Sequence, residues 1–165
     1  MGFVFQQMNM LKNLILLDKI LLPASRLNKG KRAKKELENR ARMLMKKTGI
    51  EELANRRITE VSGGQLQRAC ICRSMMGNPK ILFADEPTGA LNQSAAQEVM
   101  AEFTRLNREG TTILMVTHDS KVAARCGRIL YLLDGCIQGE FSPALFPGEK
   151  EREAAVNRWL AGMGW

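Results

Sequence analysis

Hydrophobic and polar positions follow two periods along this chain, and each period predicts one type of element. Amphipathic stretches with the 3.6-residue period of a helix cover residues 14–22, 31–48, 65–76, 93–107 and 149–160. Short apolar runs, typical of strands, cover residues 3–5, 81–84 and 112–117. The runs at 81–84 and 112–117 are continuous, which predicts strands buried on both faces of a parallel sheet. This alternation of strands and helices predicts an α/β fold.

Turn and capping residues mark where several of these elements end. Pro23 predicts the end of the first helix, and Gly49 closes the second. Asp134 and Gly135 separate two short apolar runs, and an Asp-Gly pair in that position is a strong β-hairpin signal. We therefore expect a hairpin before the helix over 149–160.

The stretch VSGGQLQR places two glycines where a helix begins. Ser62 can serve as the N-cap, and Gln65 lies at the spacing of a capping box. One interpretation is a plain cap with a flexible turn. The other is an open helix N-terminus, whose free N–H groups an anion can contact. The local sequence leaves both interpretations open.

Polar residues follow two of the expected strands, at the edge where open α/β sheets bind ligands. Asp85 and Glu86 come directly after the run at 81–84, and His118 follows the run at 112–117. Two adjacent carboxylates after a buried strand are costly unless they bind a cation or perform acid–base chemistry. The alternatives are that Asp85 caps the following turn and that His118 is structural.

Composition narrows the class of protein. The chain has 165 residues, 45% of them apolar, which suits one compact domain. No segment approaches the roughly 20 consecutive apolar residues that cross a bilayer, and the N-terminus lacks the pattern of a signal peptide. The four cysteines contain no C-x-x-C pair and there is one histidine, so zinc is not expected and reduced thiols are.

Positive charge is concentrated in residues 26–47, where ten basic residues (Arg26, Lys29, Lys31, Arg32, Lys34, Lys35, Arg40, Arg42, Lys46 and Lys47) meet only two acidic ones. This segment carries the whole net charge of +8. A solvated outer helix face is the favoured interpretation, and contact with anionic lipid headgroups is the next. A nucleic-acid surface is disfavoured because the segment has no aromatic residue to stack on a base.

Four motifs in order, VSGGQLQR, ILFADEP, TGALN and VTHD, resemble the ATP-binding-cassette (ABC) ATPases. GFVFQQMNML, DEPTGAL, the hairpin and the MGW tail are most similar to exporters of the macrolide, bacitracin and lipoprotein-release type. The resemblance implies a partial P-loop NTPase fold, with a mostly parallel core sheet, a helical subdomain and a C-terminal hairpin plus helix.

The resemblance implies one partial nucleotide-binding domain over residues 1–165. Its parts are the Q-loop strand (1–7), the helical subdomain with the signature helix (8–78), the Walker B, D-loop and H-loop core (79–140) and the C-terminal helix (141–165).

The same resemblance implies a role for each motif residue, with ATP and Mg²⁺ as cofactors. Glu86 is the general base for the attacking water, and His118 contacts the γ-phosphate. Asp85 and Gln6 hold Mg²⁺. The further nucleotide-binding residues are Ser62, Gly63, Gly64 and Gln65, which contact an ATP bound mainly by the partner subunit, together with Gln6 and Asn92.

Two departures from the family pattern stand out. Asn92 occupies the D-loop position that normally holds Asp, and no G-x-x-x-x-G-K-S/T motif occurs among the fourteen glycines. The resemblance therefore implies a chain truncated before the Q-loop, by a misassigned start, a gene fragment or a deliberate truncation. Its C-terminus resembles a natural one.

The expected function is that of the ATP-binding and ATP-hydrolysing subunit of an ABC transporter, more in keeping with an exporter, here as a fragment. The alternative is a non-catalytic remnant or regulatory module that binds a partner without hydrolysing ATP alone. Expected partners are a membrane permease and, when complete, a second identical domain, with no nucleic acid. The expected location is cytoplasmic, peripheral at the inner face of the cell membrane through the permease.

Overall fold

The computed structural model describes residues 1–6, 14–25 and 31–165. Residues 7–13 and 26–30 lie outside the described residues. They include the end of the expected Q-loop strand, the start of the expected helical subdomain and two of the ten basic residues. The chain forms two compact units, Met1–Val116 and Thr117–Trp165, and each is described by itself.

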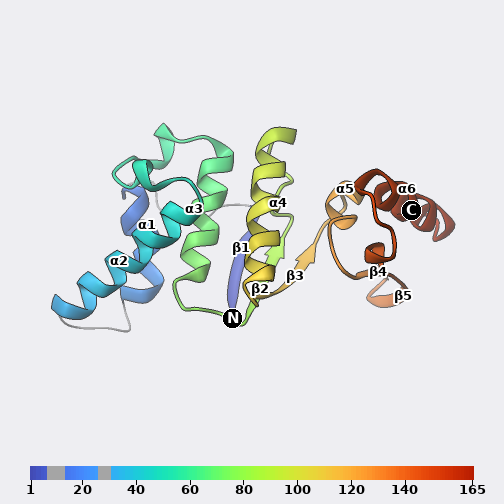
Figure 1. Ribbon diagram of the computed structural model, residues 1–165, viewed down its shortest axis with the longest axis horizontal. Coiled ribbons are helices and arrows are strands. Elements are labelled where there is room, and N and C mark those ends of the chain that lie inside the picture. The colour runs from blue at the N-terminus through green and yellow to red at the C-terminus, as the bar shows by residue number, and fades with distance from the viewer. Residues whose placement is uncertain (7–13, 26–30) are drawn as a thin grey trace. The chain divides into compact units, whose positions relative to one another are not determined.

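A parallel sheet of three strands is the framework of the first unit (Figure 1). The strands are β1 (Gly2–Phe5), β2 (Ile81–Asp85) and β3 (Thr112–Val116), with β2 in the centre. Phe5 pairs with Asp85, and Asp85 pairs with Val116. The carboxyl ends of all three strands therefore lie at one edge, which confirms the predicted parallel α/β arrangement.

The other elements described in the first unit are helices and two short 3₁₀ turns. They are α1 (Leu16–Ser25), α2 (Lys31–Lys47), η1 (Glu51–Leu53), η2 (Ile58–Glu60), α3 (Gly63–Met75) and α4 (Gln93–Arg108). α3 packs against β1 and α4 packs against β3, while α1 and α2 pack against each other and against α3 (Figure 1). Among the described residues, no helix has both the length and the hydropathy that crossing a membrane requires.

In the part of the first unit that the structure describes, helices cover one face of the sheet and leave the other uncovered. Leu82 and Ala84 of β2 are buried together with Val4 of β1, whereas Leu114 and Val116 of β3 are 53% and 60% exposed. The prediction that the runs at 81–84 and 112–117 are buried on both faces is wrong. Successive side chains of a strand point to opposite faces, and α3 and α4 cover only one of them.

The open face carries a stack of aromatic rings. Phe3 lies between Phe5 and Phe83, with ring centroids 6.0 Å and 5.2 Å away and nearly parallel planes. Phe3 remains 50% exposed and Phe5 46% exposed, so these rings bury their area mainly against one another. In the described part of the chain this face is an apolar surface open to solvent.

Helix α1 differs from its expected limits. It continues to Ser25, two residues beyond Pro23, which lies in the last turn. Proline removes one backbone donor there, a small loss so close to the helix end. Lys19, also in α1, is only 1% exposed, and within the described residues its Nζ has no hydrogen-bond partner. Burial lowers the pKa of Lys19.

The second unit is a hairpin packed on a helix. Its elements are α5 (Ser120–Ala123), β4 (Ile129–Leu133), β5 (Cys136–Phe141), η3 (Pro143–Leu145) and α6 (Glu149–Gly162). The turn residues Asp134 and Gly135 have φ angles of 51° and 77°, the left-handed values that an Asp-Gly hairpin turn requires, which confirms the predicted hairpin. Trp159 of α6 stacks on Phe141 at 5.2 Å and meets the edge of Tyr131 at 6.3 Å.

The four cysteines, all within the described residues, form no disulfide bond. Cys70 and Cys72 are buried in α3, and burial raises the pKa of these thiols to about 11 and about 12. Cys72 Sγ also lies 3.2 Å from Thr48 Oγ1, which joins α3 to the end of α2. These two thiols therefore act as packing groups in their protonated form.

The one-sided burial of the sheet predicts opposite results for two leucine truncations. Leu82→Ala should cost about 2–5 kcal/mol of unfolding free energy because it opens a cavity under the helices. Leu114→Ala should stay within about 0.5 kcal/mol of the parent, since it shortens an exposed side chain. Urea unfolding of both variants measures this. Equal losses would contradict the open face and mean that it is covered in solution.

Candidate functional site

Three of the predicted site residues lie at the carboxyl edge of the sheet. Gln6 follows β1 directly, Asp85 is the last residue of β2, and Glu86 comes next. Because Phe5 and Asp85 are paired in the parallel register, Gln6 and Glu86 leave the sheet at the same level. The side chain of Asp85 is exposed and that of Glu86 is half-buried.

Glu86 has an unusual backbone conformation. Its φ angle is 45°, in the left-handed region that few residues other than glycine adopt. Its N–H donates to the carbonyl of Val116 at 2.9 Å, and its carbonyl accepts from Gly89 N–H at 3.2 Å. These bonds fix a backbone that costs energy to hold, of order 1–3 kcal/mol. Such strain is concentrated at functional sites in proteins, so it marks Glu86 as a candidate.

Gly89 brings the side chain of Gln6 to the turn after Glu86. A Cβ atom added to Gly89 would lie 2.9 Å from Gln6 Nε2 and 3.6 Å from the Cβ of Glu86. Any larger residue would therefore press on Gln6. Sequence reasoning assigns no role to Gly89, although its place in TGALN, three residues after Glu86, is the signal that could have indicated one.

The start of α3 forms the capping box that the sequence predicts. Ser62 Oγ accepts a hydrogen bond from Gln65 N–H at 3.3 Å, and Gln65 Oε1 accepts one from Ser62 N–H at 2.8 Å. Ser62 and Gly63 are exposed, whereas Gly64 is buried. The cap interpretation is thus confirmed, and the exposed end of the helix stays compatible with an anion contact.

The two glycines of the motif have different surroundings. A Cβ atom on Gly64 would lie 2.8 Å from the Cβ of Ala95 in α4, closer than side chains tolerate. A Cβ atom on Gly63 would lie 3.2 Å from Leu91 Cδ2, the end of a flexible side chain. Gly64 therefore has a packing role, the close approach of α3 to α4, which neither interpretation of the motif includes.

Asn92 caps the helix against which Gly64 packs. Its Oδ1 accepts a hydrogen bond from Ala95 N–H at 2.9 Å, at the N-terminus of α4. Asn and Asp are equally good N-caps, so the amide preserves the local structure at this departure from the family pattern. The cap also positions Ala95 against Gly64 and so links the starts of α3 and α4.

His118 belongs to the second unit, two residues after the end of β3. Its side chain is exposed. The next residue, Asp119, caps the short helix α5 by accepting a hydrogen bond from Lys121 N–H at 2.8 Å, and its own N–H donates to Thr117 Oγ1 at 3.1 Å. The first unit thus gathers Gln6, Asp85 and Glu86 at one edge, and His118 is described apart from them.

Comparison with known proteins decides the family. The sequence profile of the family described as "ABC transporter" matches residues 1–89, more than half of the chain. The chain belongs to the ABC transporter family. The match includes the edge residues Gln6, Asp85 and Glu86 and the start of α3.

Relatives of this ABC chain include ATP-binding proteins of bacteria. It is 43% identical over 136 residues to the ABC transporter ATP-binding protein YxdL of Bacillus subtilis, covering 82% of this chain and 52% of YxdL. It is 41% identical over 134 residues to the macrolide export ATP-binding/permease protein MacB of Escherichia coli, covering 81% of this chain and 20% of MacB.

Solved structures show that the fold is that of an ABC cassette with a P-loop NTPase core. The cassette MJ0796, solved as a dimer bound to ADP and Pi, superposes with a TM-score of 0.74 at 38% identity. The match covers 86% of this chain and 62% of that one. The ABC chain therefore spans about half of YxdL and about three fifths of MJ0796.

Gly63 and Gly64 of the ABC chain should respond differently to substitution. Gly64→Ala forces a methyl group against Ala95 and should cost about 1–3 kcal/mol of unfolding free energy through overpacking. Gly63→Ala should leave stability unchanged or raise it by about 0.4–1 kcal/mol, because alanine restricts the unfolded chain. Thermal and urea unfolding of both variants measures the difference. If Gly63→Ala lowered the unfolding free energy as much as Gly64→Ala, the close approach of α3 to α4 would not explain the loss.

Proposed function

We propose that this chain is a partial nucleotide-binding domain that carries the signature helix and the hydrolytic carboxylate of an ABC transporter ATPase. The observation that carries the proposal is the placement of Gln6, Asp85 and Glu86 at one sheet edge, with Glu86 held in a left-handed backbone conformation. Polar groups at the carboxyl ends of parallel strands form ligand sites in α/β proteins.

Glu86 is the proposed general base. Its carboxylate would accept the proton of the water that attacks the γ-phosphate of ATP. The hydrogen bonds of its backbone to Val116 and Gly89 hold it at the end of β2, so its position is set before a nucleotide arrives. His118 is proposed to contact the γ-phosphate.

Asp85 and Gln6 fit a magnesium ion. They offer one carboxylate and one amide oxygen at the same edge of the sheet. Mg²⁺ prefers oxygen ligands, and it usually takes only one or two of them from the protein and the others from water and phosphate. Asp85 is exposed and is therefore accessible to such an ion. A bound Mg²⁺ would neutralise charge on the ATP phosphates.

The start of α3 is proposed to bind the phosphates of an ATP held mainly by a second subunit. The exposed Ser62 and Gly63 lie at the N-terminus of a 13-residue helix, whose dipole and free N–H groups favour an anion. Gln65 holds Ser62 in the capping box, and Asn92 caps the helix that packs on Gly64. This arrangement requires two nucleotide-binding domains, and the solved relative MJ0796 is a dimer.

The proposed partner is a membrane permease, because the relative MacB is named as an ATP-binding/permease protein for macrolide export. We therefore propose an exporter, with this chain at the cytoplasmic face of the membrane through its permease. Nucleic acid is not a proposed partner.

A second candidate function is that of a partner-binding module that does not hydrolyse ATP. The observation that favours it is the absence of any G-x-x-x-x-G-K-S/T motif from the 165 residues. Such a loop supplies the backbone N–H groups and the lysine that hold the ATP phosphates.

The absence of this motif predicts that the 165-residue chain binds Mg-ATP with a dissociation constant above about 1 mM, which corresponds to a binding free energy weaker than about −4 kcal/mol. The residues at the start of α3 offer only the half of a site that completes a partner's nucleotide. Titration calorimetry of the chain with Mg-ATP measures the affinity. A micromolar dissociation constant would contradict the proposal that this chain offers only half of an ATP site.

The two candidate functions separate in a chimera that carries a segment with a G-x-x-x-x-G-K-S/T motif before Met1. ATP hydrolysis by the chimera is the expected result, and Glu86→Gln should lower its rate about 10²–10⁴-fold because proton acceptance is lost. The matched control is Glu52→Gln, an exposed glutamate of η1 that should keep the parent rate.

A phosphate-release assay measures ATP hydrolysis. Size-exclusion chromatography with and without Mg-ATP measures nucleotide-dependent dimerisation. Glu86→Gln should accumulate as an ATP-bound dimer, whereas Asp85→Asn should weaken metal-dependent nucleotide binding. His118→Ala should lose turnover and keep affinity. A Glu86→Gln chimera that hydrolyses at the parent rate would refute the assignment, and an inactive parent chimera would favour the partner-binding module.

A further inference from the structure

Gln67 is a buried polar residue on an otherwise apolar side of α3. Its side chain is only 1% exposed. The other buried residues of this helix are small or apolar: Gly64, Ala69, Cys70, Ile71, Cys72 and Met75. Gln67 Oε1 has no hydrogen-bond partner among the described residues. A buried polar atom without a partner lowers the free energy of unfolding, so packing alone does not account for a glutamine at this position.

The amide nitrogen of Gln67 contacts the last residue of β1. Its Nε2 donates a long hydrogen bond, 3.5 Å, to the carbonyl of Phe5. Seven positions later on the same side of α3, Ser74 Oγ donates to the carbonyl of Phe3. α3 packs along β1 (Figure 1), so these two side chains attach the helix to the strand at two points. Gln67 makes the attachment at the carboxyl edge of the sheet, where the candidate site lies.

The carbonyl of Phe5 belongs to the peptide unit that leads into Gln6. Because a peptide unit is planar, a hydrogen bond to this carbonyl restricts the rotation of the plane from which Gln6 departs. The side chain of Gln6 reaches the turn after Glu86, where a Cβ atom added to Gly89 would lie 2.9 Å from Gln6 Nε2. The orientation of that peptide therefore determines where the Gln6 amide lies.

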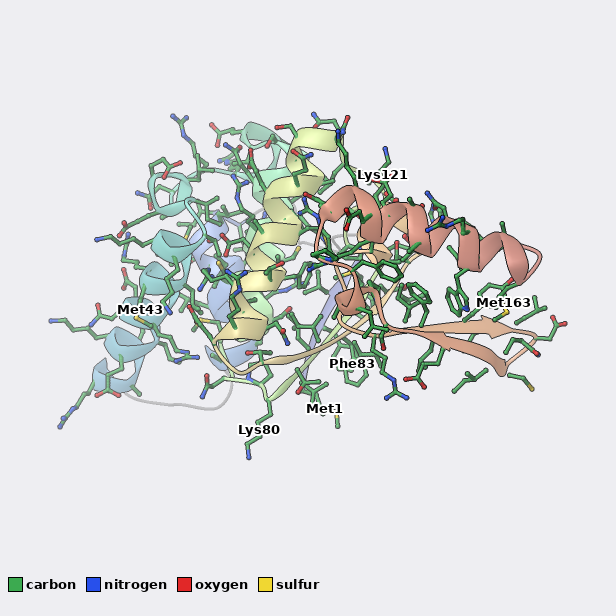
Figure 2. The ribbon with its side chains drawn as sticks, turned by 45° about the vertical axis from the view of Figure 1, so that its right-hand side comes forward. Met1, Met43, Lys80, Phe83, Lys121 and Met163 are labelled. Carbon is green, nitrogen blue, oxygen red and sulfur yellow. The ribbon has the colours of Figure 1, made fainter. Side chains whose placement is uncertain are left out.

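Side-chain packing holds this end of β1 only weakly. Val4 is buried under the helices, whereas Phe5 is 46% exposed. The ring of Phe5 stacks on that of Phe3 on the open face of the sheet, where Phe83, labelled in Figure 2, also lies. The hydrogen bond from Gln67 adds a constraint from the covered face.

We propose that Gln67 is a positioning residue that ties the peptide before Gln6 to α3. A residue that breaks a local rule, here a buried amide with an unpartnered oxygen, is expected where function requires it. Gln67 is the fifth residue of α3, about 6 Å along the axis from the helix start. It thus connects the proposed phosphate-binding helix end to the proposed magnesium ligand Gln6. The roles of these two ends rest on the proposed function, but the tether itself requires no nucleotide.

Backbone ¹⁵N relaxation of the 165-residue chain tests the tether directly. Gln67→Met keeps a side chain of similar length without a donor, and the matched control Ser74→Ala removes the donor at the other end of β1. Gln67→Met should lower the order parameter of the Gln6 N–H below the value of about 0.85 that is typical of rigid backbone. Ser74→Ala should leave it unchanged. An unchanged Gln6 in Gln67→Met, or equal decreases in both variants, would overturn the proposal.

Urea unfolding separates positioning from packing. Gln67→Met removes an unpartnered buried oxygen and keeps a similar volume, so its unfolding midpoint should equal or exceed that of the parent. A lower midpoint with an unchanged Gln6 order parameter would mean that Gln67 has only a structural role. Gln67→Leu repeats both measurements with a second apolar side chain if Gln67→Met does not fold.

The chimera that restores the G-x-x-x-x-G-K-S/T motif extends the test to ATP hydrolysis. Gln67→Met should raise the Mg²⁺ concentration for half-maximal hydrolysis about tenfold, since residues that orient a metal ligand typically change metal affinity about 10–100-fold. Ser74→Ala should keep the parent value. An active chimera in which Gln67→Met keeps the parent Mg²⁺ dependence would overturn the positioning role. An inactive parent chimera would instead contradict the proposed function, and the Gln6 order parameter would then decide the tether by itself.

Discussion

The parallel hydrogen bonding of β2 to both of its neighbours is the constraint on which the candidate site depends. Its register aligns Phe5, Asp85 and Val116, so the chain leaves three strands at one level. The same alignment allows the N–H of Glu86 to bond to Val116 and fixes the strained backbone of the proposed base. A change of register would move Gln6 away from Glu86 and separate the carboxylate from its amide neighbour.

A second contact links the candidate site to α3. Gly64 and Ala95 let α3 and α4 approach without an intervening side chain, and Asn92 caps α4 at that point. The exposed end of α3 is therefore held by the segment that follows Asp85 and Glu86 along the chain. This contact explains how the first unit can present the proposed phosphate-binding end of α3 and the proposed hydrolytic carboxylate from a common framework.

The open face of the sheet is the energetic weakness of the first unit. A fully buried leucine or phenylalanine contributes about 1.5–3 kcal/mol, and Phe3, Leu114 and Val116 forgo much of that contribution. Whole-domain stabilities are about 5–15 kcal/mol, so the loss is large in proportion. The stacked rings of Phe3, Phe5 and Phe83 recover part of it by covering one another.

The sequence alone determined features that depend on residues close together in the chain. The capping box of Ser62 and Gln65 and the hairpin turn at Asp134 and Gly135 involve contacts over a few positions, and the run that forms β2 is continuous in the sequence, so local patterns indicated all three. The four motifs likewise indicated the family. Only the tertiary structure decided which face of each strand is buried, that Lys19 lies in the interior, and that Gly64 packs on Ala95. These outcomes depend on segments far apart in sequence, whose register and packing no local pattern encodes.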